Sequence, residues 1–437
     1  MKTSVWVTVT AALVLFILAT PSLACEGCTQ TDWQWVSTSE VADTGVLHTT
    51  WEAQRPPYGP YDKIALHRFV YRGGDWGKYP RPGKVLFHLP GTWDTAWKGI
   101  TDPAYENHVF FALNGYAVYS MDYRVSYLPE LPQEGFDSSS TEAWTYGAFR
   151  EDIKACIEKA KKLSHTRKVF LSGFSRGGTQ MWIYASKYGE ADLKGLIGLD
   201  GGAPYASPAA PRTETEYQAA MDAFLASQAP RLSPSTTYEG YNRIQFAGIL
   251  PGSTHVPGYG SLEDCLYDSD YYELYGPPPQ GTNLDTISDL MAYFYNYAWN
   301  ERFGGIQDFG VLTNYYEGMM DQSTLIRAEA GMEFYWPAVQ NVEQESDPGY
   351  GDNIADIDLP VLFFGGILGC GYEGSRCPPD GPFKCASEDV SVVTLPHFGH
   401  MDVMWGTQSL EQVKQPMLEW MDAHARSNGR YRHFRSR

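Results

Sequence analysis

Short hydrophobic runs alternate with amphipathic segments through the first half of the chain. Nearly continuous apolar runs, typical of strands buried on both faces, occur at Lys84–Leu89, Lys168–Ser172 and Leu193–Leu199. Further strands are predicted at Val46–Trp51, Lys63–Tyr71 and Tyr116–Met121. Apolar residues recur at helical spacing in the segments Tyr105–Leu113, Ser139–Leu163 and Gly178–Tyr188. This alternation predicts an α/β fold in which helices cover both faces of a mostly parallel sheet.

The alternation stops between residues 204 and 357, which are rich in Pro, Tyr and Gly and contain scattered helical segments such as Glu216–Ala226. It resumes with strands at Leu359–Gly365 and Asp389–Leu395 and a helix near Leu410–Ala423. A long insertion between two strands of one sheet is typical of a lid. We therefore expect one core, residues 25–203 and 358–425, a mainly helical cap at 204–357 and a basic flexible tail at 426–437.

The first 24 residues have the three parts of a signal peptide. Lys2 precedes an apolar run that ends near Ala19, and Pro21, Ser22 and Ala24 follow. The run is shorter than the roughly 20 residues that span a bilayer, so we expect cleavage after Ala24 and export to the periplasm, cell envelope or medium, without a transmembrane anchor. Cys25 would then begin the mature chain, which leaves a bacterial lipoprotein as the alternative.

The seven cysteines fit an oxidising compartment. Cys156 lies on the apolar face of the Ser139–Leu163 segment, so we expect a buried free thiol there. The other six are compatible with three disulfides of undetermined connectivity: Cys25, Cys28, Cys265, Cys370, Cys377 and Cys385. Their spacing matches no zinc site.

Charge and composition exclude several classes of protein. The 437 residues carry a formal net charge of −19, which opposes binding to nucleic acid. Only 19% of residues are charged while 43% are hydrophobic, so a large core is expected rather than disorder. Acidic positions in the insertion, such as Glu263 and Asp264, lack the spacing of a calcium-binding loop. Nothing in the sequence calls for a metal or an organic cofactor.

One motif carries candidate chemistry. Gly173-Phe174-Ser175-Arg176-Gly177 joins the strand ending at Ser172 to the helix beginning near Gly178. A serine on such a sharp strand-to-helix turn projects its hydroxyl beyond the sheet edge, and the glycines allow helix and strand to approach. The helix N-terminus adds N–H groups that can stabilise an oxyanion. Ser175 is therefore the candidate nucleophile.

With this motif, the segments HLPGTW, SMDYR and FGHMDVMWG make the chain resemble the α/β-hydrolase superfamily outside the insertion. The resemblance implies that the backbone N–H groups of Thr92 and Arg176 form the oxyanion hole. Pro90 stands where many relatives have a histidine, a departure that affects the Thr92 assignment. The loop Gly399-His400-Met401-Asp402 resembles that of the acid lipases and implies that His400 is the base, with His397 as the alternative.

The sequence does not decide which residue supplies the acid of a Ser-His-acid triad. In most relatives it follows the strand that here reads PVLFFGG, but the sequence continues Ile367-Leu368-Gly369 without a carboxylate. Asp200, which ends the Leu193–Leu199 strand, corresponds to the position that pancreatic-type lipases use. Glu373, in the cysteine-rich segment, is the other candidate. A triad is defined by geometry rather than chain order, so either position, or another residue, is compatible with the sequence.

These observations predict a serine hydrolase that cleaves a small or lipid-like carboxylic ester through an acyl-enzyme. Peptidases share the fold, and an acidic cap would suit an amine substrate, so a peptidase or aminopeptidase is the alternative enzyme. A non-catalytic binding protein of the same fold is a third possibility, although both Ser175 and His400 are present. The oligomeric state is not predicted.

Overall fold

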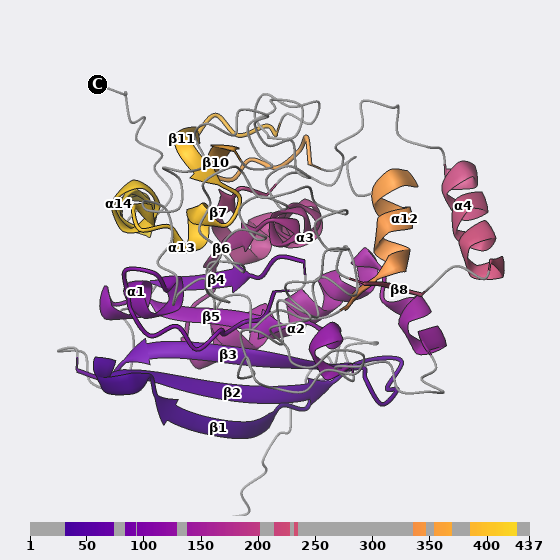
Figure 1. The fold of residues 1–437 in the computed structure, drawn as a ribbon, viewed down its shortest axis with the longest axis horizontal. Coiled ribbons are helices and arrows are strands. Elements are labelled where there is room, and N and C mark those ends of the chain that lie inside the picture. Colours follow the sequence, from indigo (N-terminus) through magenta and orange to yellow (C-terminus); the bar gives the residue numbers. More distant parts are fainter. Residues whose placement is uncertain are drawn as a thin grey trace, which may run out of the picture.

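The computed structural model describes residues 31–73, 84–92, 94–128, 138–201, 214–227, 231–234, 335–346, 354–368 and 385–425. Within these ranges a nine-stranded sheet forms the centre of the molecule (Figure 1). Its strands are β1 (Gln34–Glu40), β2 (Val46–Gln54), β3 (Lys63–Tyr71), β4 (Val85–Leu89), β5 (Ala117–Asp122), β6 (Val169–Phe174), β7 (Leu193–Leu199), β10 (Val361–Leu368) and β11 (Val390–Gly399).

The strand order is β1-β2-β3-β5-β4-β6-β7-β10-β11. From β5 to β11 all neighbours are parallel, whereas β1, β2 and β3 pair antiparallel and β3 pairs antiparallel with β5. The sheet is therefore mixed and mostly parallel, as the sequence predicted. Because β4, β6, β7 and β11 are parallel, the loops that follow them all leave from the same edge.

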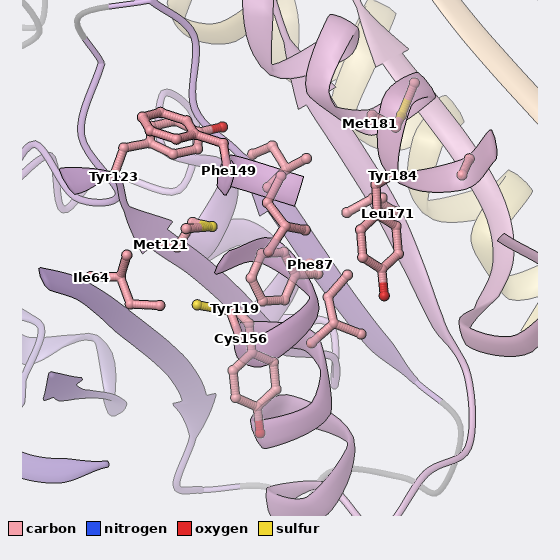
Figure 2. Close-up of a cluster of buried hydrophobic side chains, with 14 of the residues drawn as sticks. Ile64, Phe87, Tyr119, Met121, Tyr123, Phe149, Cys156, Leu171, Met181 and Tyr184 are labelled. Carbon is pink, nitrogen blue, oxygen red and sulfur yellow. The ribbon is translucent and has the colours of Figure 1, made fainter. Parts of the chain in front are cut away.

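Successive side chains of the central strands enter two separate hydrophobic clusters. Phe87 and Leu171 join one cluster, and Leu86 and Phe170 join the other. This follows from the alternation of side chains across a strand. Figure 2 shows the first cluster, where Phe87, Tyr119 and Leu171 of the sheet face Phe149 and Cys156 of a helix. Helices cover both faces of the sheet.

The helices of the described residues are α1 (Asn107–Leu113), α2 (Tyr146–Leu163), α3 (Arg176–Asp192), α4 (Glu214–Ala226), α12 (Ala338–Ser346), α13 (Asp402–Trp405) and α14 (Gln415–Ala425). Buried residues of α2 and α3 belong to the first cluster, and those of α1, α13 and α14 to the second. The described part contains no helix with both the length and the apolarity needed to cross a bilayer.

Two predicted helices differ in the structure, and one strand was not predicted. The helix predicted over Ser139–Leu163 is divided into a 3-10 helix at Ser138–Ala143 and α2. Thr145 separates them because its extended backbone lets its side chain cap α2 through the N–H of Ala148. The C-terminal helix begins with a π-helical turn at Leu410–Lys414 before α14. Strand β1 was not predicted, because all seven of its residues are exposed and no buried alternation marks it.

Most of the predicted cap, residues 204–357, lies outside the described residues, and the division into domains stays a prediction. The described parts include α4 and α12 and two short strands, β8 (Leu232–Pro234) and β9 (Tyr335–Pro337). These strands pair antiparallel, with Pro234 opposite Tyr335. Residue 234 therefore lies beside residue 335.

The predicted disulfides need one correction. Cys156 is a fully buried free thiol, as expected. Cys385, which was expected to pair, is also a free thiol and is partly buried against the hydrophobic cluster between the sheet and α2. The other five cysteines lie outside the described residues.

Candidate active site

Ser175 occupies a sharp turn between β6 and α3. Its backbone angles, φ 53° and ψ −124°, lie in a region that side-chain-bearing residues rarely adopt. Hydrogen bonds hold the turn: Ser175 N donates to Leu199 O over 3.1 Å, and Gly178 N donates to Ser175 O over 2.9 Å. The serine is thus fixed at the carboxyl end of β6 in the conformation that the GxSxG motif predicted.

The glycines of the motif are sterically required. A Cβ added at Gly173 would lie 2.2 Å from the Gly177 carbonyl oxygen, and one added at Gly177 would lie 2.2 Å from Leu89 O. Both obstacles are backbone atoms, which cannot rotate away. The absence of side chains here lets α3 start directly against β4 and β6.

The turn that follows β4, hereafter the β4 turn (Gly91–Asp94), packs against the serine. A Cβ on Gly91 would lie 3.0 Å from Ser175 Cβ, and Asp94 N donates to Gly91 O over 3.3 Å. Thr92 therefore lies within a turn that packs against Ser175, and Arg176 follows Ser175 in the chain. The first N–H groups of a helix have no acceptor inside the helix, so the N–H of Arg176 is available to a ligand.

Several side chains hold the loop that contains the β4 turn. Tyr123 Oη donates to Pro90 O over 3.2 Å, and burial raises the pKa of this phenol, so it stays a donor. Asp122 Oδ1 accepts the N–H of Ala96 at 2.8 Å. Lys98 pairs with Asp94 over 2.7 Å, and both side chains are nearly fully buried. Sequence reasoning assigned no role to Asp94, Lys98 or Asp122; the segment SMDYR, which contains Asp122 and Tyr123, was the available signal.

Asp200 and His400 are joined by a hydrogen bond of 2.6 Å between Asp200 Oδ2 and His400 Nδ1. Asp200 immediately follows β7 and is completely buried, while His400 follows β11 and is 3% exposed. The other carboxylate oxygen of Asp200 accepts the N–H of Gly366 in β10 over 3.0 Å. Two separate donors therefore fix the orientation of the carboxylate.

This pair lies against the serine turn. The imidazole of His400 stacks on Phe174, with ring centroids 4.7 Å apart, and Phe174 directly precedes Ser175. Trp405 contacts the same phenyl ring edge-on at 5.7 Å. On the acid side, a Cβ at Gly201 would lie only 2.3 Å from Ser175 O, so the backbones after β6 and β7 touch. Ser175, His400 and Asp200, predicted separately from three distant segments, thus meet at one edge of the sheet.

The described residues do not include the side chains of the two alternative candidates for the acid and the base. Glu373 and the side chain of His397 lie outside the described residues, and so does Trp93 of the β4 turn. Among the described residues, no group of three or more His, Cys, Asp or Glu side chains is arranged to hold a metal ion.

Sequence searches found no matching family and no matching curated protein. Structure comparison did find matches. A protein solved as a "putative lipase" from Sulfolobus solfataricus superposes with a TM-score of 0.60 at 22% identity, over 90% of this chain and 99% of that chain. The chain has the α/β-hydrolase fold.

Other solved proteins with an α/β-hydrolase fold match less well. A thioesterase domain from the curacin biosynthetic pathway gives a TM-score of 0.42 at 11% identity, over 90% of this chain and 99% of that chain. A thermophilic esterase from Thermogutta terrifontis gives 0.41 at 15% identity, over 83% and 95%. In the α/β-hydrolase fold described here, the serine turn follows β6, Asp200 follows β7 and His400 follows β11.

Proposed function

We propose that the protein is a serine hydrolase that cleaves a carboxylic ester through an acyl-enzyme. The observation that carries this proposal is the buried Asp200–His400 hydrogen bond beside the strained turn of Ser175. A carboxylate on Nδ1 sets the tautomer in which Nε2 accepts a proton, and it stabilises the imidazolium that then forms. Those are the two requirements for activating a serine hydroxyl.

In this mechanism His400 removes the proton of Ser175 Oγ as the oxygen attacks the ester carbonyl carbon. The N–H groups of Thr92 and Arg176 stabilise the oxyanion, and removal of one such donor typically costs about 10²–10³ in rate. His400 then returns the proton to the departing alcohol. Water repeats the sequence, releases the acid and restores the serine.

We also propose that the chain is exported by the signal peptide at residues 1–24. The pattern of Lys2, the apolar run and Ala24 supports this. N-terminal sequencing of secreted protein should find Cys25 first, and retention of Met1 would contradict export with cleavage.

Labelling with a fluorophosphonate tests the nucleophile directly. Wild-type protein should be labelled, and Ser175→Ala should abolish labelling while the circular dichroism spectrum is unchanged. Persistent labelling of this variant would place the nucleophile elsewhere. Nitrophenyl esters of increasing chain length, compared with amino-acid nitroanilides, should show turnover of the esters; preferential cleavage of the anilides would assign a peptidase instead.

A further inference from the structure

The side chain of Arg176 occupies a defined position beside the proposed nucleophile. Arg176 is the first residue of α3, where Cα–Cβ bonds tilt toward the helix N-terminus and so toward the sheet edge that carries Ser175. Its Nη2 donates to Asn341 Oδ1 of α12 over 3.0 Å. The guanidinium also lies over the ring of Trp336, 5.3 Å from the centroid. Two contacts thus fix the plane of the guanidinium.

In the described part of the chain, no carboxylate balances the positive charge of this guanidinium. Elsewhere, Arg124 pairs with Asp62 and Asp152 at 2.6 Å, and Arg231 pairs with Glu142. No carboxylate of a described residue forms an ion pair with Arg176, and its Nη1 is buried without a hydrogen-bond acceptor. A buried donor without an acceptor is unfavourable, and a charged donor is more so than a neutral one. The Nη1 donors of Arg176 can therefore bind an anionic group.

The guanidinium is also close to the reacting centre. Trp336, on which it lies, contacts the ring of Tyr123 edge-on at 5.4 Å. Tyr123 in turn donates to Pro90 O, next to the β4 turn. Arg176 and Ser175 are adjacent in sequence, so their Cα atoms are about 3.8 Å apart. An anion bound by Arg176 would belong to the molecule whose ester reaches Ser175.

We propose that Arg176 binds a carboxylate on the substrate, so that the enzyme prefers esters that carry a second, ionised carboxyl group. Guanidinium suits this task because its fork of N–H donors matches the two oxygens of a carboxylate. The inference rests on the proposed esterase function. The carboxylate can belong to the acyl part or to the alcohol part of the ester. Test substrates that carry the carboxylate in one part or in the other distinguish these two cases.

The test compares charged and neutral esters of similar shape. For the acyl part, 4-nitrophenyl hemiglutarate is compared with 4-nitrophenyl hexanoate; for the alcohol part, 4-butyryloxybenzoate is compared with phenyl butyrate. In one of the two pairs, wild-type kcat/KM should favour the charged ester by about 10-fold or more, the range of a charge-assisted hydrogen bond. Arg176→Gln should remove this preference, and Arg176→Lys should restore part of it.

Arg167→Gln is the matched control, since it removes one exposed positive charge and should leave the wild-type preference unchanged. The proposal fails if wild-type protein favours neither charged ester, or if the preference survives in Arg176→Gln. Failure of the esterase function itself would appear separately, as absent fluorophosphonate labelling and no turnover of any ester. In that case, calorimetric titration with glutarate tests the anion site directly. Glutarate should bind measurably to wild-type protein and not to Arg176→Gln. Equal binding to both proteins would overturn the proposed site.

Discussion

At the residue scale, Ser175 and Asp200 both hold an unfavourable backbone conformation. Their φ angles are 53° and 46°, and a sparsely populated backbone conformation of this kind costs about 1–3 kcal/mol per residue. Hydrogen bonds from Ser175 N to Leu199 O and from Asp200 N to Phe364 O tie both residues to neighbouring strands. The rigid sheet thus maintains two strained turns whose side chains serve the proposed reaction.

Replacing Asp200 by Asn should separate folding from catalysis. Asn accepts a positive φ and can still accept the N–H of Gly366, so circular dichroism and the urea midpoint should change little. The Asn amide cannot stabilise imidazolium and favours the wrong tautomer of His400, so kcat should fall by about 10⁴.

Glu373→Gln is the comparison for that experiment, and its ester turnover should stay near the wild-type value. A large loss in Glu373→Gln with a small one in Asp200→Asn would move the acid to the cysteine-rich segment.

At the element scale, the sequence predicted strands well where they are buried on both faces. Leu193–Leu199 and Lys63–Tyr71 have the same bounds in β7 and β3 as in the prediction. Strand β1 was not predicted, because alternation of hydrophobic and polar residues marks only strands that have a buried face. Ser175 and Asp200 became candidates because each follows a predicted strand, and His400 because its loop resembles that of the acid lipases; their catalytic roles stay a prediction.

The choice between Asp200 and Glu373, by contrast, depended on which carboxylate lies beside His400. The distance from a carboxylate to His400 depends on how strands far apart in the sequence pack together, and no local sequence pattern encodes it. The positions of Asn341 and Trp336 were unpredictable for the same reason, because they approach Arg176 only through the packing of α12 and β9 against α3.

Strands β2, β3 and β4 carry histidines on one face of the sheet, where His67 and His88 are buried and His48 is partly buried. His48 Nε2 lies 2.8 Å from His67 Nδ1, and His67 Nε2 lies 2.8 Å from Asp122 Oδ2. Burial, followed by the nearby His67 and His108, lowers the pKa of His48 to about 3, although Asp122 opposes the shift. Burial also holds the pKa of His88 well below its usual range.

These histidines should make the protein less stable in acid. Between about pH 6.5 and 3 the unfolded chain binds a proton at His48 that the folded chain does not, so the free energy of unfolding falls as the pH falls. In His48→Gln this dependence should weaken by up to about 1.4 kcal/mol per pH unit below pH 6.

Urea denaturation from pH 7.5 to 4.5 measures the effect. His165→Asn, at an exposed histidine whose positive φ Asn tolerates, should keep the wild-type slope. A His48→Gln slope equal to that of wild type would show that His48 is protonated in the fold.

At the scale of the whole molecule, a buried ionic network joins the N-terminal strands to α2. Arg124 pairs with Asp62, which precedes β3, and with Asp152 of α2, each at 2.6 Å, and Arg55 reaches Asp152 from the end of β2 at 2.8 Å. Trp144 Nε1 also donates to Asp62 over 2.8 Å. The network thus connects segments about 90 residues apart in the sequence.

Arg124→Met should therefore be strongly destabilising. It leaves the carboxylates of Asp62 and Asp152 buried with less compensation, and removal of one partner from a buried pair costs about 3–5 kcal/mol. Lys187→Met breaks the exposed pair with Glu151 and should cost less than about 1 kcal/mol. Chemical denaturation of both variants gives the comparison, and similar small losses would show that the network contributes little to stability.

The pairing of β8 with β9 has a consequence for how this chain can change over evolutionary time. Pro234 lies opposite Tyr335, so the two described residues that flank segment 235–334 are neighbours in the fold. The length and sequence of a segment attached in this way can vary while its two ends keep the same separation. A change of length within 235–334 would therefore require no change in how Ser175, Asp200 and His400 are held at the ends of the sheet strands.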